Sequence, residues 1–364
     1  MKAGVFFRLL RGRLTSAFWL MLLVFGNACS PEESNREQMV NLKVIKDDPE
    51  AQLANLNNAI ERSKKDGSLY GRRAMVLLRK GELEKALADA NQAVQLSRDN
   101  PANLFVKAQV LRAMQKPEQA LPLALQAERN SYQSSSLYVL LSELYLQKQD
   151  FEQAREYVRK ALQLSPADEY AFYYQGRIAA ASGDTAQAIK SYKFAIEHAP
   201  EFMEPKRELA GVLLHHHDYE RALPYVEAAR QLAPRDGQIL YFKGVLAQVA
   251  QKTDSAFQLF SQAVAVSDTL QQAHYRMGLI LYGRGDNEGA IEHLVKAAGA
   301  FRNLPRYMAV LASAYERTGQ SLMALEQYQR LVALDPTYTY AYQRISYLKY
   351  RLQRPVVVKD TTEF

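Results

Sequence analysis

The sequence predicts an all-α fold, a right-handed α-solenoid of eight tandem helix hairpins with a capping helix at each end. The main observation is a repeat of 34 residues that runs without a gap across residues 67–338. The second observation is the composition. Only 17 of the 364 residues are glycine and 13 are proline, while alanine and leucine recur throughout, which favours helix over sheet.

The repeat is clearest at its small residues. The eight windows begin at Gly67, Pro101, Ser135, Glu169, Met203, Gly237, Gln271 and Pro305. Position 20 is alanine in all eight windows, position 27 is alanine in seven, and position 8 is always alanine, glycine or serine. Positions 4, 7, 8 and 11 share one helix face, and positions 20, 24, 27 and 28 share a face of a second helix. Small residues let the two helices approach closely, so each window is predicted to be one hairpin.

The ends of the predicted helices carry their own signals. Position 15 is glycine in four windows, at Gly81, Gly183, Gly285 and Gly319. Glycine suits the left-handed conformation that ends a helix. Proline at position 32 ends the second helix, because it removes a backbone donor. Pro122 and Pro224 instead fall at position 22, where they are expected to shift or bend the start of the second helix.

These residues resemble the tetratricopeptide repeat family over residues 67–338. The resemblance implies a concave groove, lined by positions 2, 5, 9, 12 and 13 of the first helices, that binds a protein or peptide. The groove residues it assigns are Tyr170, Tyr173, Arg177, Arg207, Tyr241, Tyr275, Tyr282, Arg306 and Arg317. Tyrosine and arginine are enriched at binding hot spots. The alternative is that some of these tyrosines pack against neighbouring repeats.

The sequence departs from the family pattern at several positions. Tryptophan never occupies position 4, where Lys206 and His274 suggest looser packing in the fifth and seventh windows. The lysine and asparagine of the chaperone-tail clamp are absent from positions 5 and 9, which argues against binding of acidic chaperone C-termini. At the C-terminal end, further inner positions are Glu316, Tyr340, Gln343, Tyr347 and Tyr350.

The N-terminus is predicted to be a signal peptide, residues 1–28. Four basic residues precede an apolar run from Leu14 to Phe25, which is shorter than the roughly 20 residues of a spanning helix. Residues 26–29 resemble a bacterial lipobox, and the acidic residues that follow look like those of Bacteroidetes-type lipoproteins. The resemblance implies that Cys29 carries a lipid. A permanent signal anchor, ordinary cleavage that leaves a free cysteine, and an incidental thiol are the alternatives.

The rest of the chain divides around the repeat array. Residues 29–47 are predicted to be a polar tether, and residues 48–66 an N-terminal capping helix. The array occupies 67–338, a C-terminal capping helix 339–352, and a mobile tail 353–364. Capping helices cover the apolar ends that a repeat array otherwise exposes.

The sequence gives little sign of catalytic chemistry. Residues 215–218, His-His-His-Asp, fall at the end of a first helix and its turn, and adjacent helical residues point about 100° apart, so they are not predicted to bind one metal ion. No glycine-rich phosphate loop, nucleophile elbow or CxxC pair is present. Cys29 is the only cysteine and cannot form an internal disulfide. The predictions are therefore no enzyme, no cofactor and no metal.

The predicted function is a membrane-anchored interaction scaffold of the bacterial cell envelope, at the outer membrane. The prediction leaves open whether it lies on the periplasmic side or the cell-surface side. The alternative is a glycan- or nutrient-binding lipoprotein that works with a transporter, although the large irregular insert of such proteins is missing. Nucleic acid is not expected as a partner. Without residues 1–28 the charge balance is 42 basic against 39 acidic residues, and no aromatic–basic RNA motif occurs.

Overall fold

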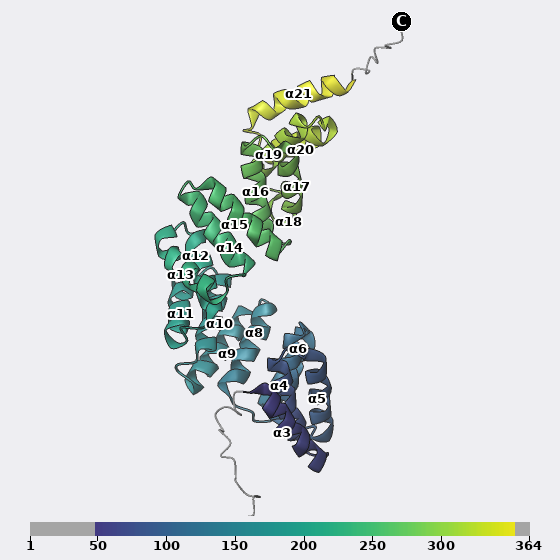
Figure 1. Cartoon of the computed structure of the whole chain (residues 1–364), viewed down its shortest axis with the longest axis vertical. Helices are drawn as coiled ribbons and strands as arrows, with labels where there is room; N and C mark the ends of the chain where they lie inside the picture. Colours follow the sequence, from purple (N-terminus) through teal and green to yellow (C-terminus); the bar gives the residue numbers. More distant parts are fainter. Residues whose placement is uncertain (1–47, 354–364) are drawn as a thin grey trace, which may run out of the picture. The chain divides into compact units, whose positions relative to one another are not determined.

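The structure, a computed structural model, describes residues 48–353. These residues form a succession of helices from α3 to α21 with no strand among them (Figure 1). The predicted signal peptide, Cys29, the tether and residues 354–364 of the tail lie outside the described residues. The chain divides into two compact units, of which unit 1 ends at Leu96 and unit 2 begins at Ser97.

Unit 1 holds three described helices. They are α3 (Pro49–Arg62), α4 (Gly67–Arg79) and α5 (Leu83–Leu96), and α4 packs against both neighbours. Asp66 caps α4 because its carboxylate accepts a hydrogen bond from the Ser68 amide at 2.9 Å. Arg73 of α4 donates two hydrogen bonds to Asp89 of α5, at 2.6 and 2.7 Å. This bidentate ion pair fixes one hairpin helix against the other.

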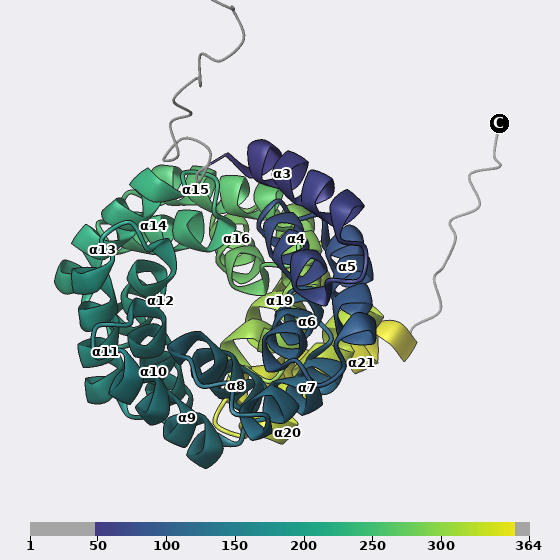
Figure 2. The same cartoon turned by 90° about the horizontal axis from the view of Figure 1, so that it is seen from below.

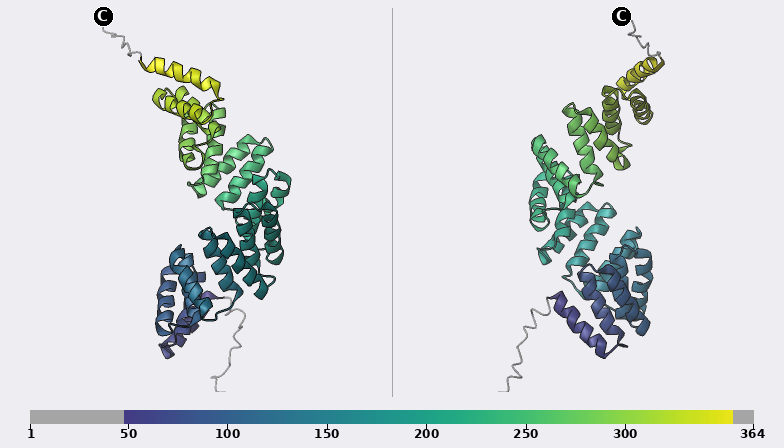
Figure 3. Two further views of the ribbon diagram at one scale, coloured as in Figure 1. Left: turned by 180° about the vertical axis from the view of Figure 1, so that it is seen from behind. Right: turned by 45° about the vertical axis from the view of Figure 1, so that its right-hand side comes forward.

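Unit 2 continues the same pattern. Its helices are α6 (Pro101–Ala113), α7 (Pro117–Arg129), α8 (Ser135–Gln147), α9 (Phe151–Leu164), α10 (Glu169–Ala181), α11 (Thr185–His198), α12 (Met203–His215), α13 (Tyr219–Leu232), α14 (Gly237–Val249), α15 (Thr253–Val266), α16 (Gln271–Gly283), α17 (Asn287–Lys296), α18 (Ala298–Phe301), α19 (Pro305–Arg317), α20 (Ser321–Leu334) and α21 (Thr339–Gln353). The first helix of every predicted window begins at the first residue of that window. α21 packs on α20 at the C-terminal end of the unit (Figure 3).

Successive hairpins of unit 2 pack side by side. α10 contacts α11 within one hairpin, and α11 contacts α12 of the next. α10, α12 and α14 lie on the inner side of the curved unit, and α11, α13 and α15 lie outside them (Figure 2). Among the described residues, none of the helices has the length and apolar character that crossing a bilayer requires.

The small residues pack as predicted. Every alanine at position 20 is fully buried, from Ala86 in unit 1 to Ala324 in unit 2. Gly176 lies directly against the Tyr192 ring, since a Cβ atom at Gly176 would stand 2.6 Å from that ring. Close approach of the two helices in a hairpin therefore depends on these residues being small.

The turn inside each hairpin has one conformation throughout. The four glycines at position 15 have positive φ values of 76° to 85°, which confirms the predicted left-handed helix stop. Three glutamines and a histidine take the same conformation at this position, with φ of 59° to 60°, at Gln115, Gln149, His217 and Gln251. In the turns with glycine and in those without it, the backbone amide of the next residue closes the turn with a hydrogen bond. Examples are Asp184 N to Ala179 O at 2.8 Å and Lys116 N to Leu111 O at 2.9 Å.

Lys206 and His274 are both buried, and the Lys206 ammonium donates to the Pro200 carbonyl, so the looser packing of the fifth and seventh windows stays a prediction. Two expectations about second helices were wrong. Pro122 and Pro224 do not shift the helix starts, since α7 and α13 begin at position 17 as the other second helices do. The second helix of the seventh window is interrupted at Ala297, whose amide is shared between His293 O and Leu294 O.

Candidate functional site

The predicted groove residues all lie on first helices of unit 2. Tyr170, Tyr173 and Arg177 belong to α10, Arg207 to α12, Tyr241 to α14, Tyr275 and Tyr282 to α16, and Arg306 and Arg317 to α19. Their environments differ from one another. Those on α10 to α14 are largely committed to packing or ion pairs, whereas those on α16 and α19 leave more of their surface open.

On α10 one of the three predicted residues is part of the core. Tyr173 is only 8% exposed, and its ring lies 5.2 Å from the Phe202 ring. Burial raises the pKa of the Tyr173 hydroxyl. Tyr170 is 52% exposed, although its ring also contacts Phe202, at 4.8 Å. For Tyr173 the structure thus shows packing against the next hairpin, the alternative that the sequence left open.

Arg177 lies at the edge of this aromatic group. Its guanidinium stands 5.8 Å from the Tyr173 ring and 5.6 Å from the Tyr174 ring. It also lines a hollow of about 420 Å³ together with Leu146 of α8 and Phe151 of α9. Cation–π contacts of this kind hold the guanidinium in place while leaving its N–H groups available.

Arg207 and Tyr241 link neighbouring hairpins. Arg207 Nη1 donates to Asp236 Oδ2 at 3.0 Å, and the same carboxylate caps α14 by accepting from the Ile239 amide at 2.9 Å. The charge of Arg207 therefore serves the junction between α12 and α14. Tyr241 is half-buried, with its ring 5.7 Å from the Phe260 ring.

The residues on α16 and α19 form a more open group. The Tyr275 ring stacks on the Phe301 ring, with centroids 4.3 Å apart and planes 12° apart. The Tyr282 hydroxyl lies 2.8 Å from the Ser313 hydroxyl, and the exposed Arg317 guanidinium sits 4.7 Å from the Tyr282 ring. These contacts fix the orientation of both side chains without burying them.

α21 extends this group. The sequence pattern predicted its tyrosines as inner residues but did not predict Arg344. Arg344 pairs with Glu316, at 3.0 Å from Nε to Oε2, and Tyr328 donates to the same carboxylate at 3.1 Å. The Arg344 guanidinium also lies 4.9 Å from the ring of Tyr347, which is 47% exposed. Arg344 stands at position 6, outside the family's groove positions, so the register alone did not point to it.

We refer to Tyr282, Arg317, Tyr340, Arg344 and Tyr347 as the C-terminal surface. Tyr340 joins it because its exposed ring lies 6.2 Å from the Tyr328 ring, next to the ion pair of Arg344. Burial raises the pKa of the Tyr340 hydroxyl, and the neighbouring tyrosine hydroxyls add to the shift. Glu316 is neutralised by Arg344, whereas Arg317 makes no ion pair with any residue in 48–353.

The histidine run lies away from these residues. His216 Nε2 stands 3.1 Å from Thr185 Oγ1, and His217 Nδ1 stands 2.6 Å from the Tyr219 hydroxyl. His215 is exposed at the end of α12. The adjacent rings are thus directed to different partners, and residues 48–353 contain no group of three or more metal-ligating side chains.

Antiparallel helix pairs that follow one another through short turns define a helical-repeat solenoid. The chain belongs to the tetratricopeptide repeat family. Models described as "Tetratricopeptide repeat" match residues 67–100, 105–169, 173–236, 208–269 and 275–339. Proteins of this family bind protein partners and are in general non-catalytic scaffolds.

Individual relatives are distant. BBSome complex member BBS4 from Bos taurus is 24% identical over 201 residues, covering 55% of this chain and 39% of the relative. Protein O-mannosyl-transferase TMTC1 from Homo sapiens is 24% identical over 149 residues, 40% of this chain and 17% of the relative. The chain thus spans well under half of either relative. The crystal structure of the APC/C hetero-tetramer Cut9–Hcn1 superposes with a TM-score of 0.61 at 16% identity, covering 82% of this chain and 58% of that one, which shows a shared fold.

Proposed function

We propose that the protein is a membrane-anchored scaffold of the bacterial cell envelope that binds a protein or peptide partner through its inner face. The C-terminal surface is the observation that carries the proposal. Its tyrosines and arginines are exposed or half-buried, yet each is held by a ring contact, a hydrogen bond or an ion pair. Side chains fixed before binding lose little conformational entropy when a partner arrives.

The chemistry of this surface favours a particular kind of partner. Tyrosine rings offer apolar area together with hydroxyl groups for hydrogen bonds. Arg317 is exposed and forms no ion pair within the described residues, so it supplies unneutralised positive charge next to the Tyr282 ring. A segment with apolar or aromatic side chains and nearby carboxylates is the complement of such a surface.

The anchor in this proposal is the lipid on Cys29. Support comes from the sequence, in which the only cysteine follows a signal-like segment and precedes a polar stretch. Two or three acyl chains anchor a protein stably where one is marginal. We expect Cys29→Ser to move the protein from the membrane fraction to the soluble fraction. Immunoblotting of the two fractions measures this change. An intact mass that shows an unmodified Cys29 in the wild type would contradict the anchor.

The alternative, a glycan-binding lipoprotein, receives no support from the described residues. Such proteins hold their ligand in a large irregular insert, whereas no break between consecutive helices from α3 to α21 exceeds five residues.

The test of the binding surface is a crosslinking pull-down from envelope extracts, followed by mass spectrometry. The test variant combines Tyr282→Ala, Arg317→Ala and Tyr347→Ala. The matched control combines Tyr342→Ala and Arg330→Ala, which remove the same residue types from exposed positions outside the C-terminal surface. We expect partner recovery to fall only in the test variant. Equal recovery by both variants, with unchanged helical circular dichroism, would refute the assignment.

A further inference from the structure

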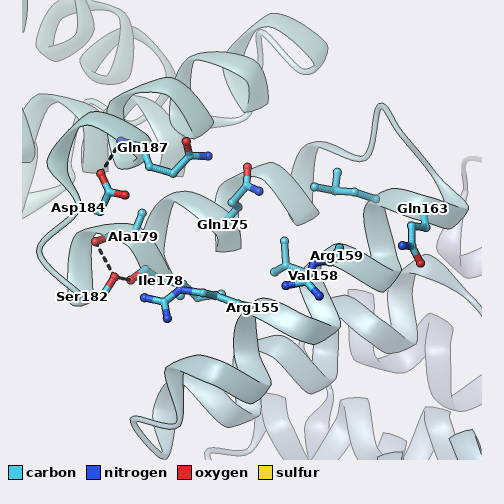
Figure 4. A pocket seen from close by; sticks show the side chains of 11 residues that line it. Arg155, Val158, Arg159, Gln163, Gln175, Ile178, Ala179, Ser182, Asp184 and Gln187 are labelled. Atoms are coloured by element: carbon cyan, nitrogen blue, oxygen red, sulfur yellow. Dashed lines mark hydrogen bonds between the residues drawn. The ribbon is translucent and has the colours of Figure 1, made fainter.

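A cleft separate from the inner face lies between α9 and the α10–α11 hairpin (Figure 4). Its volume is about 440 Å³. α10 contributes residues at positions 7, 10 and 11, its C-cap residue Ser182 stands at position 14, and none of the family's groove positions lines the cleft. The C-terminal surface contains none of its residues, so the two features can be tested independently.

Two side chains that line the cleft are short. Position 11 is Ala179 and position 14 is Ser182, whereas four other windows have leucine at position 11, at Leu77, Leu111, Leu213 and Leu281. The Ser182 hydroxyl turns away, to the carbonyls of Ile178 and Ala179 at 2.9 and 3.2 Å. The apolar floor is completed by Val158. A leucine at position 179 would occupy part of this space.

Positive charge is concentrated on one wall. Arg155 and Arg159 are four residues apart on α9, so both project from the same face of that helix into the cleft. Arg159 has no ion pair with any residue between 48 and 353. Arg155 donates to Glu152 at 2.6 Å, but the Glu152 side chain is 86% exposed, and exposed ion pairs of this kind stabilise little. Both guanidinium groups can therefore accept a new anionic partner.

The remaining polar groups add hydrogen-bond donors. Gln175 Oε1 accepts from the Ser191 hydroxyl at 2.9 Å, and that hydroxyl accepts from Gln187 Nε2 at 3.1 Å. These two hydrogen bonds leave the side-chain N–H groups of Gln175 as donors for a ligand. Asp184 is the one acidic lining residue, and it lies at the far end from Arg159, where its Oδ1 already accepts from the Gln187 amide at 3.0 Å (Figure 4).

We propose that this cleft binds an acidic peptide segment of a protein partner, with a carboxylate side chain seated between Arg155 and Arg159. The carboxylate receives charge-assisted hydrogen bonds from the two guanidinium groups. The neighbouring apolar side chains of the segment pack on Leu162, the half-buried apolar residue of the lining. The scaffold thus offers a second contact surface whose specificity is for negative charge.

The probe for this proposal is a fluorescein-labelled octapeptide of alternating glycine, glutamate and leucine, compared with the same peptide in which glutamine replaces each glutamate. Fluorescence polarisation with the full chain measures both affinities at low and high salt. The first variant is Arg155→Ala with Arg159→Ala. The second is Ala179→Leu, which fills the cleft without changing charge and introduces the residue that four other windows accommodate. Arg221→Ala with Arg230→Ala on α13 is the matched control.

We expect the glutamate peptide to bind about tenfold more tightly than the glutamine peptide, as charge-assisted hydrogen bonds imply. High salt, the arginine variant and Ala179→Leu should each remove that preference, and the α13 control should keep it. Equal binding of the two peptides by the wild type would overturn the proposal. So would a preference that survives in both cleft variants but disappears when Tyr282 and Arg317 are replaced, because the peptide would then bind the C-terminal surface.

Discussion

Replacing the left-handed glutamines of the hairpin turns by glycine should stabilise the protein. Gln115, Gln149 and Gln251 have φ of 59° to 60°, and their side chains are exposed. A residue with a Cβ atom loses roughly 1–2 kcal/mol in this conformation, because the Cβ crowds the following carbonyl oxygen. Glycine removes that strain but gives the unfolded chain more freedom, which offsets about 0.5–1 kcal/mol. The net gain is about 0.5–1 kcal/mol at each site.

The three sites lie in different hairpins, so their effects should add to about 2 kcal/mol in the triple variant. Urea denaturation followed by helical circular dichroism measures the change, and the midpoint should rise stepwise from single to triple variant. The reverse substitution, Gly183→Gln, is the control. Gly183 has φ of 81°, and a Cβ atom there would have no atom within 4 Å beyond its chain neighbours, so backbone strain is the main difference between the two residues. Unchanged midpoints in both directions would refute the strain argument.

Two further predictions concern the hairpin interiors. Gly176→Ala should destabilise unit 2 by about 1–3 kcal/mol, since the new Cβ atom would stand 2.6 Å from the Tyr192 ring. The melting temperature of the variant measures this loss, and an unchanged value would show that the ring moves freely. Acid should also destabilise the seventh window. Burial lowers the pKa of His293 below 6.5, and His274, whose Nδ1 lies 2.8 Å from His293 Nδ1, lowers it further. The unfolded state then binds the proton more readily, so stability is complete above pH 6.5 and declines as the pH falls towards the lowered folded value. Urea midpoints at about pH 7.5 and 5.5 should differ more in the wild type than in His293→Gln, and an equal difference would contradict the assignment.

The hairpins were predictable because their determinants are local. Each first helix begins where the window begins, and the position-20 alanines are buried in every case. The left-handed turn was predicted only where glycine marks it. Gln115, Gln149 and Gln251 adopt it because the hydrogen bonds of the turn, such as Lys116 N to Leu111 O, require it whatever residue is present.

The binding surface was less predictable. The repeat position of a residue indicates which helix face it occupies, but not how much of its side chain is exposed. Tyr173 occupies a groove position but is covered by Phe202, which lies in the connection between α11 and α12. Nothing in the repeat pattern indicates how far a connecting residue reaches over its neighbour. Arg344 was missed for the opposite reason, since it stands outside the groove positions yet reaches Glu316 across the helix junction.

The contact between Gly176 and Tyr192 has a counterpart in two other hairpins. A Cβ atom at Gly244 would stand 2.5 Å from the Phe260 ring, and one at Gly278 would stand 2.7 Å from Leu294. In each case the missing volume and the large side chain that fills it belong to the same window. A hairpin therefore carries its own compensation when it is duplicated or moved along the array. The small residue and the large one can change together inside one hairpin, which leaves the exposed positions free to diverge towards new partners.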